Sequence, residues 1–415
     1  MRSLSAALVI AAVVSLVACP SCSHQDGGAV QHVFDPYAGP APYPDLRPKL
    51  ALPDGDFALV PSSGSDTLTL IDLADGKTVG AAPVGRDPVA LDGPHQVVAD
   101  RARGLAFAVL SYPGSAANAG QHSHGSSSVP GWVQVVALDD LRAVGELRVD
   151  PNPGEIALSD DGQRLVVTHF DLTTAANPQL TIDQRRASLA VVDPRTIQPF
   201  GTPEPDKLLV CVAPHGVTLS HPDGAKAFVA CYGEDVVAIV DLVDTNAPVV
   251  RVPVAATVVP DPPVGAPAFG PYAVSLSASG TRLAVSNRDA KELRFLDVAK
   301  AAMEPLVVTL LGSPYFSAWS ADGAKVFVPM RGLDALAIVD ATNGTVVRTK
   351  VFDPAACAQP LEAIVPADPA MLFVVCEGNV GVPGAILTLD ATTLDVRARA
   401  EVGAAPGRTF VGRGK

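Results

Sequence analysis

Hydrophobic positions along this chain recur as short runs rich in β-branched residues, and each run ends at an aspartate followed by a turn. Short runs bounded by turn residues are typical of β-strands. We interpret the aspartates as caps of the turns, because an aspartate side chain accepts hydrogen bonds from the backbone just ahead of it. The runs end at Asp72, Asp139, Asp193, Asp241, Asp297, Asp340 and Asp390.

Two further strands precede most of these runs, and a fourth strand follows. The segment 214–231 shows the unit clearly, with P-H-G-V-T-L-S followed by the turn H-P-D-G and then by A-K-A-F-V-A-C. Pairs such as D-G and S-G between alternating strands indicate hairpin turns. Four strands repeated at intervals of about 45 to 55 residues predict the blades of a β-propeller.

The ends of the repeat region predict how the ring closes. The first unit starts at Phe57 without an opening strand, whereas the last segment, 405–412, has the pattern of an opening strand with nothing after it. Pairing that segment with the N-terminal strands would complete the first blade and remove open sheet edges. We therefore predict an all-β, seven-bladed β-propeller of four-stranded blades over residues 55–415, closed by this pairing.

The repeat resembles the YVTN family of β-propeller repeats, in which P-x-G-I-A-V-S-P-D-G, a second strand and a V-x-V-I-D strand recur. The resemblance covers roughly residues 57–412, and P-G-E-I-A-L-S-D-D-G at 153–162 is one of its copies. It implies the propeller fold and a scaffold with a binding surface. It does not imply one reaction, because the family includes cell-surface proteins, redox-partner proteins and a few enzymes.

The first residues predict export. Arg2 precedes an apolar run over 6–14 that is too short to span a bilayer, and the sequence L-V-A-C ends at Cys19. This resembles the lipobox of bacterial lipoproteins, so we expect a signal peptide over 1–18 and a lipid anchor on Cys19. An ordinary signal peptidase site just before the cysteine is the alternative. The proline-rich segment 19–54 would be an extended tether.

The amino-acid composition and net charge limit which classes of partner this protein can bind. Hydrophobic residues make up 48% of the chain and charged residues 18%, which indicates a well-filled core, while 35 glycines and 38 prolines disfavour long helices. The formal net charge of -13 argues against nucleic acid and against anionic lipid surfaces. We expect a lipid-anchored monomer on the periplasmic side or outer surface of a bacterial membrane, whose partner is a protein or a small envelope ligand.

Four cysteines in the repeat region predict two disulfides. Cys211 lies three residues before an opening proline and Cys231 ends the second strand of that blade, and Cys357 and Cys376 repeat this arrangement. The two strands are antiparallel neighbours, so the start of one lies beside the end of the other. Export to an oxidising compartment favours the pairs Cys211–Cys231 and Cys357–Cys376. A metal site is the weaker alternative, because these cysteines show no C-x-x-C spacing.

Residues that follow the opening prolines are the candidates for chemistry, since the first strand of each propeller blade lines the central channel. We expect a ligand site at the channel mouth, formed by His95, Glu155, His215, Tyr272, Tyr315, Glu362 and Arg408. Within it, His95, His215 and Glu155 would offer nitrogen and oxygen ligands suited to zinc or a similar divalent ion. The alternative is that these side chains only line a water-filled pore.

Loops on the same face supply further polar residues, namely His169, Glu234, Arg288, Arg331 and Glu377. An insertion over 111–131 carries His122 and His124, which we expect to lie in a solvated loop rather than a metal site. The sequence contains no phosphate-binding loop, dinucleotide fingerprint, haem attachment motif or hydrolase elbow.

The leading hypothesis is therefore a non-catalytic binding or scaffolding protein. The main alternative is a lactonase-like or metal-assisted hydrolase, with His95 or His215 as base and Arg408 polarising a carbonyl. A third is an electron-transfer accessory that holds haem or copper through channel histidines. The sequence assigns no cofactor, and a divalent metal is the candidate.

Overall fold

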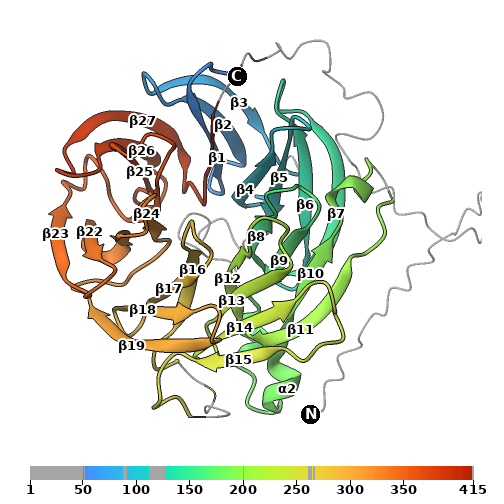
Figure 1. Cartoon of the computed structure of the whole chain (residues 1–415). Helices are drawn as coiled ribbons and strands as arrows, with labels where there is room; N and C mark the ends of the chain where they lie inside the picture. The colour runs from blue at the N-terminus through green and yellow to red at the C-terminus, as the bar shows by residue number, and fades with distance from the viewer. Residues whose placement is uncertain are drawn as a thin grey trace, which may run out of the picture. The chain divides into compact units, whose positions relative to one another are not determined.

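The computed structural model describes residues 50, 52–86, 91–111, 127–199, 201–259, 264 and 267–413. Within them the strands form seven four-stranded sheets. Figure 1 shows these sheets following one another in sequence order around a ring, clockwise in this view. The predicted seven-bladed β-propeller is confirmed. The predicted signal peptide, Cys19, nearly all of the predicted tether, and the histidines His122 and His124 lie outside the described residues.

The first three blades, each given from its inner to its outer strand, have the following bounds. Blade 1 contains β28 (Phe410–Arg413), β1 (Asp56–Ser62), β2 (Thr67–Asp72) and β3 (Lys77–Pro83). Blade 2 contains β4 (Pro94–Asp100), β5 (Leu105–Leu110), β6 (Pro130–Ala137) and β7 (Ala143–Pro151). Blade 3 contains β8 (Pro153–Leu158), β9 (Leu165–His169), β10 (Arg186–Val192) and β11 (Asp206–Val212).

The remaining four blades keep the same order. Blade 4 contains β12 (Pro214–Leu219), β13 (Lys226–Cys231), β14 (Val236–Asp241) and β15 (Val250–Pro253). Blade 5 contains β16 (Pro271–Leu276), β17 (Arg282–Asn287), β18 (Glu292–Asp297) and β19 (Ala302–Thr309). Blade 6 contains β20 (Ala318–Trp319), β21 (Lys325–Met330), β22 (Ala335–Asp340) and β23 (Val346–Val351). Blade 7 contains β24 (Pro360–Ile364), β25 (Met371–Cys376), β26 (Pro383–Asp390) and β27 (Val396–Ala404).

The helical segments are short. Within the described ranges they are α1 (Leu172–Ala175) and α2 (Ile182–Arg185) in the connection between β9 and β10, and the 3-10 turns η1 (Pro194–Thr196) and η2 (Arg331–Leu333). None of the helices among the described residues is both long and apolar enough to cross a membrane.

The core lies between adjacent blades. Second and third strands such as β13 and β22 are almost wholly buried, because each blade packs face to face against both of its neighbours. The rings of Phe295 in blade 5 and Trp319 in blade 6, for example, lie 5.6 Å apart. Outer strands such as β23 are mostly exposed. This explains why the third strand of each unit gave the strongest hydrophobic pattern.

The ring closes as predicted. β28 pairs antiparallel with β1, with Asp56 opposite Arg413 and Leu59 opposite Phe410. Upstream of β28, the amide of Gly407 donates to the carbonyl of Pro61 at 2.9 Å. The last strand of the chain is therefore the innermost strand of the first blade.

Two further expectations about local structure are confirmed. The strand-end aspartates accept bonds from the turns that follow, as at Asp241, whose Oδ1 accepts from the amides of Val243 at 2.9 Å and Asp244 at 2.8 Å. The same capping occurs at Asp72, Asp193, Asp297, Asp340 and Asp390. In the turn after Asp139 it is the next residue, Asp140, that accepts from the amide of Arg142 at 3.0 Å. Both disulfides form in the predicted pairing, with Cα atoms 5.8 Å apart for Cys211–Cys231 and 5.2 Å apart for Cys357–Cys376.

The propeller's contacts begin slightly before residue 55, where we placed its start. Leu50 and Leu52 pack against the core between blades 1 and 2, and the amide of Leu50 donates to the carbonyl of Asp139 at 2.6 Å. The end of the predicted tether therefore already belongs to the packed domain.

Candidate functional site

Side chains at the second position after the opening prolines meet at the axis of the ring. Arg408, just before β28, donates from Nε to Oε1 of Glu362 in blade 7 at 2.9 Å, and its guanidinium also pairs with Glu155 in blade 3. The guanidinium carbon lies 4.7 Å from the ring centre of Phe316 in blade 6. One side chain from the closing segment therefore contacts three other blades.

Both carboxylates also bind the backbone, so they are part of the scaffold. The side chains of Glu155 and Glu362 are 1% and 4% exposed. The amide of Thr409 donates to Glu362 at 2.7 Å, and the amide of Val217 in blade 4 donates to Glu155. A carboxylate held this way fixes the separation of neighbouring blades.

Burial shifts the pKa values of the charged side chains at the axis. It raises the pKa of Glu362 to about 8 and lowers the pKa of Arg408 to about 10, because each loses solvation of its charged form. With a pKa of about 8, Glu362 keeps its proton near neutral pH.

The two channel histidines bond to the neighbouring blade. Nε2 of His95 lies 2.6 Å from the carbonyl oxygen of Gly154, and Nδ1 of His215 lies 3.0 Å from that of Tyr272. His215 also stacks on the ring of Tyr272 at 3.8 Å between centroids. Burial lowers the pKa of His95 and lowers that of His215 well below its ordinary value, so both are neutral at pH 7.

Close approach of the inner strands explains one glycine of the repeat. A Cβ at Gly407 would collide with the carbonyl of His95. The amide of Arg408 donates to that same carbonyl at 2.9 Å. Without a side chain at position 407, the closing segment reaches blade 2 and positions Arg408 over the axis.

The predicted metal set is not assembled. Among the residues that the structure describes, no group of three His, Cys, Asp or Glu side chains is arranged to hold a metal ion. The physical reason lies in the bonds just given: Glu155 is paired with Arg408, while His95 and His215 each bond to a carbonyl of the next blade.

The predicted tyrosines and three of the predicted loop residues gather on the face where the inner strands begin, which we call the mouth face. Nε of Arg331 donates to Oε2 of Glu377 at 2.6 Å, and the guanidinium of Arg331 lies 5.7 Å from the ring of Tyr315. The rings of Tyr315 and Tyr272 are 5.0 Å apart. Burial raises the pKa of Glu377 to about 7, although Arg331 opposes that shift.

Arg288 extends this group toward blade 4. Its guanidinium lies 4.7 Å from the ring of Tyr232 and 5.1 Å from that of Tyr272. Nε donates to Asp289 at 2.9 Å, and Nη2 donates to the hydroxyl of Tyr232. We call Tyr232, Tyr272, Arg288, Tyr315, Arg331 and Glu377 the arginine–tyrosine cluster.

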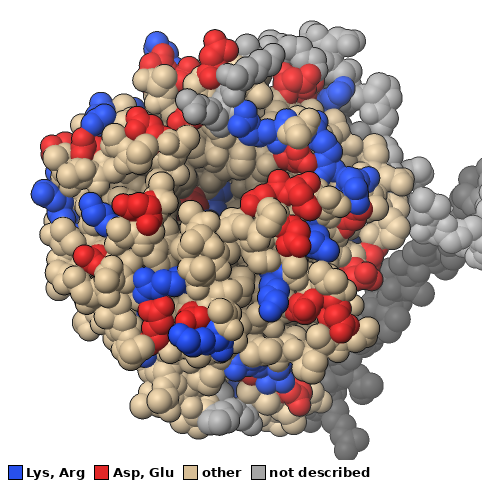
Figure 2. Space-filling view, in the orientation of Figure 1, with Lys and Arg blue, Asp and Glu red and all other residues tan. Residues whose placement is uncertain are grey.

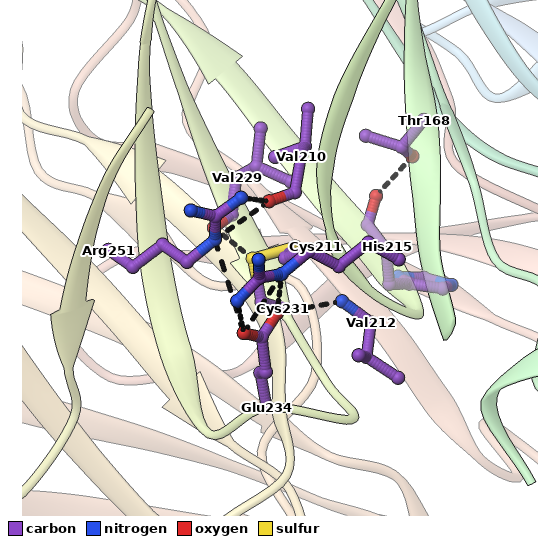
Figure 3. Close-up of a disulfide and its surroundings, with 10 residues drawn as sticks. Thr168, Val210, Cys211, Val212, His215, Val229, Cys231, Glu234 and Arg251 are labelled. Carbon is purple, nitrogen blue, oxygen red and sulfur yellow. Dashed lines mark hydrogen bonds and ion pairs between the residues drawn. A yellow bond between two sulfur atoms is a disulfide. The ribbon is translucent and has the colours of Figure 1, made fainter. Parts of the chain in front are cut away.

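The other two predicted loop residues are structural. Figure 3 shows Glu234 beside the Cys211–Cys231 disulfide, where it accepts from the amide of Val212 at 2.9 Å. Nη2 of Arg186 donates to Glu234 at 2.7 Å, which ties the start of β10 to blade 4. Nδ1 of His169 lies 2.9 Å from the carbonyl of Ser188. Neither residue belongs to the arginine–tyrosine cluster.

Sequence reasoning missed several residues around the axis. The side-chain amide of Gln96 donates to the carbonyl of Ile156 and accepts from its amide, both at 2.8 Å. The guanidinium of Arg408 lies over the ring of Phe316. Gln96 and Phe316 occupy the repeat position of Glu155, so the repeat register identifies these two positions, although the predicted ligand set did not include them. Tyr232 directly follows the second strand of its blade, at the same repeat position as Arg288.

The insertion between β9 and β10 could not be placed from sequence. Leu172 and Ala175 of α1 and Ile182 of α2 pack against an aromatic cluster that includes Phe170, Tyr272, Tyr315 and Phe316. The insertion therefore covers part of the mouth face. In Figure 2 the ring is hollowed near its centre, and acidic and basic side chains are interspersed on the face in view.

Comparison with solved structures supports the fold. The chain is similar to the periplasmic gluconolactonase PpgL of Pseudomonas aeruginosa, with 17% identity and a TM-score of 0.60 over 87% of this chain and 100% of that one. It is similar to a putative 6-phosphogluconolactonase from Bacteroides uniformis, with 13% identity and a TM-score of 0.59 over 86% and 100% of the two chains. It is also similar to the dihydro-heme d1 dehydrogenase NirN, with 18% identity and a TM-score of 0.55 over 88% and 77%.

At these identities the likeness concerns the fold alone. No protein-family model matches the chain, and no curated protein matches it by sequence. The resemblance to the YVTN repeat therefore stays a prediction.

Proposed function

We propose that this chain is a non-catalytic binding module of the bacterial cell envelope, and that its binding surface is the arginine–tyrosine cluster on the mouth face. The bonding at the axis is the observation that carries this proposal. His95, His215 and Arg408, which a hydrolase would use as base and electrophile, each bond to a neighbouring blade. Groups that hold the scaffold together are poorly placed to exchange protons with a substrate.

The arginines of the cluster keep donors for an anion: each uses Nε to bond a carboxylate, Asp289 or Glu377, but Nη2 of Arg331 makes no hydrogen bond within the described part of the chain. Side chains of Arg288 and Arg331 are 27% and 16% exposed, and each lies against a tyrosine ring. A guanidinium binds a carboxylate through two parallel hydrogen bonds, and an aromatic ring beneath it restricts its orientation. The ligand would be a carboxylate-bearing small molecule or an acidic side chain of an envelope protein.

The location is part of the proposal. The sequence L-V-A-C ending at Cys19 supports a lipid anchor, and the periplasmic gluconolactonase among the similar structures supports an exported protein. We place the protein in the envelope as a YVTN-like propeller monomer tethered through its N-terminus.

One observation favours a second candidate function, hydrolysis of a lactone. Glu377 is buried, has a pKa of about 7 and lies 2.6 Å from Arg331, so it can exchange a proton near neutral pH beside a cation. Two of the three similar structures named above carry a lactonase name: the gluconolactonase of Pseudomonas aeruginosa and the putative 6-phosphogluconolactonase of Bacteroides uniformis. Hydrolysis would then occur within the same cluster and not at the axis.

A single set of variants separates the two functions. We would measure the thermal shift of the purified protein with gluconate, citrate and an acidic peptide, and follow hydrolysis of gluconolactone by proton release. Binding by the wild type that is lost in Arg288→Gln with Arg331→Gln, without hydrolysis, would support the binding module. Arg397→Gln, which removes an arginine 47% exposed on an outer strand, is the matched control. Hydrolysis that disappears in Glu377→Gln would overturn the non-catalytic proposal.

A further inference from the structure

A pocket of about 720 Å³ lies at the end of the channel opposite the mouth face. Its walls are the turn after β4, the turn after β8 and the first residue of β28, so it opens between the inner strands of blades 1, 2 and 3. The volume lies within the range of small-molecule sites in proteins. None of the arginine–tyrosine cluster lines it.

The lining combines an apolar floor with a charged rim. Val98, Leu158 and Phe410 form apolar surface, and all three are only partly buried. The charged residues of the lining are three arginines and three aspartates, namely Arg101, Arg103, Arg195, Asp100, Asp160 and Asp161. Because the two signs are equal in number, the rim offers both hydrogen-bond donors and acceptors without a net charge to select an ion.

One bond between blades and two bonds within blades hold part of the rim in place. Nη2 of Arg103 in blade 2 donates to the carbonyl of Gly162 in blade 3 at 2.6 Å, and Nε pairs with Asp100 at 2.5 Å. Asp161 accepts from the hydroxyl of Ser159 at 2.6 Å. Arg103, Asp100 and Asp161 therefore keep fixed directions before any ligand binds, which lowers the entropic cost of binding.

We propose that this pocket binds a neutral oligosaccharide. Each sugar hydroxyl both donates and accepts a hydrogen bond, which matches a rim of arginines interspersed with aspartates. The C–H faces of a pyranose ring are apolar and pack against an aromatic ring, which Phe410 supplies. The volume suits a short chain better than a single ring. A charged sugar would lose solvation of its carboxylates without a net positive rim to offset that loss, so it should bind more weakly.

The test is isothermal titration calorimetry of the purified full chain with maltotriose, cellotriose and tri-N-acetylchitotriose, and with trigalacturonic acid as the charged comparator. We expect saturable binding of at least one neutral trisaccharide, and at least tenfold weaker binding of the charged one. Phe410→Leu, which keeps an apolar side chain at that position, should weaken binding about fivefold through loss of the ring.

Phe410 also packs against Phe57, so its replacement could weaken binding by destabilising the fold. A second variant, at an exposed residue of the rim, separates the two effects. Asp160→Ala removes a rim acceptor whose side chain is 56% exposed, and it should weaken binding by a similar factor. Arg288→Gln with Arg331→Gln should leave sugar binding unchanged, which separates this pocket from the mouth face. Absence of binding by all three neutral trisaccharides, or equal binding of the charged one, would overturn the proposal.

Discussion

Replacement of Arg408 by glutamine would test whether the ion pairs at the axis of the ring stabilise the closed propeller. Arg408 belongs to the last segment of the chain, and its guanidinium is the group shared between Glu155 and Glu362. Glutamine is shorter and neutral, so it cannot pair with either carboxylate. Glu155 would then be a buried charge without its cation.

The magnitude follows from burial. Removing one partner of a buried ion pair costs about 3–5 kcal/mol, because the remaining charge stays in a low-dielectric site. The side chain of Arg408 is 28% exposed, so water can partly solvate Glu155 once the guanidinium is gone. We therefore expect a loss at the lower end of this range, about 3 kcal/mol. For a domain of this size that corresponds to a fall in Tm of about 4 °C.

The assay is thermal unfolding followed by circular dichroism under non-reducing conditions, so that both disulfides stay intact. Arg397→Gln is again the control and should leave Tm unchanged. Adding Glu155→Gln to Arg408→Gln should recover part of the lost stability, because it removes the uncompensated charge. An unchanged Tm for Arg408→Gln, or a double variant less stable than the single one, would refute the reasoning.

Four further predictions concern other parts of the chain. Burial raises the pKa of Glu362 from 4.5 to about 8, so between these pH values the folded state holds a proton that the unfolded state releases. The free energy of unfolding of the wild type, relative to that of Glu362→Gln, should therefore fall as pH rises from about 5 to 8. If urea denaturation gives the same pH dependence for both proteins, this prediction is contradicted. Replacing Cys211 and Cys231 by alanine should lower the free energy of unfolding by about 3 kcal/mol, as expected for a loop of this length, and equal stability would argue against it. Glu234→Gln should cost about 2 kcal/mol and speed proteolysis of the insertion at 170–185, whereas a wild-type cleavage rate would show that Glu234 does not hold that insertion. Cys19→Ser should release the protein from membranes and abolish lipid labelling, and retained labelling would disprove the anchor.

Several features were predictable because they depend on contacts that the repeat itself encodes. The blade period fixes which strands are antiparallel neighbours, and that is enough to pair Cys211 with Cys231. The same logic assigned the C-terminal segment to the first blade, since a ring with one strand missing has one place for it. The strand-end aspartates act within two or three residues, so they too were evident from local sequence.

The candidate site was only partly predictable. The repeat register put Glu155, Glu362 and Arg408 at equivalent positions before or in the inner strands, but it could not show that Arg408 pairs with both carboxylates. The same register placed His95 and His215 beside the axis, where a carbonyl of the neighbouring blade fixes each ring. Which partner a side chain meets at an axis depends on the twist and spacing of seven separate sheets.

The sequence by itself thus determined the strands, the blade order, the ring closure and the disulfides, because each follows from periodicity and from the geometry of antiparallel neighbours. Only the tertiary structure decided that the charged side chains at the axis pair with one another and join different blades. It also decided that an arginine–tyrosine cluster forms on one face of the ring and a pocket on the opposite face. The physical reason is that these features join residues from different blades, whose relative positions arise from packing across the whole ring.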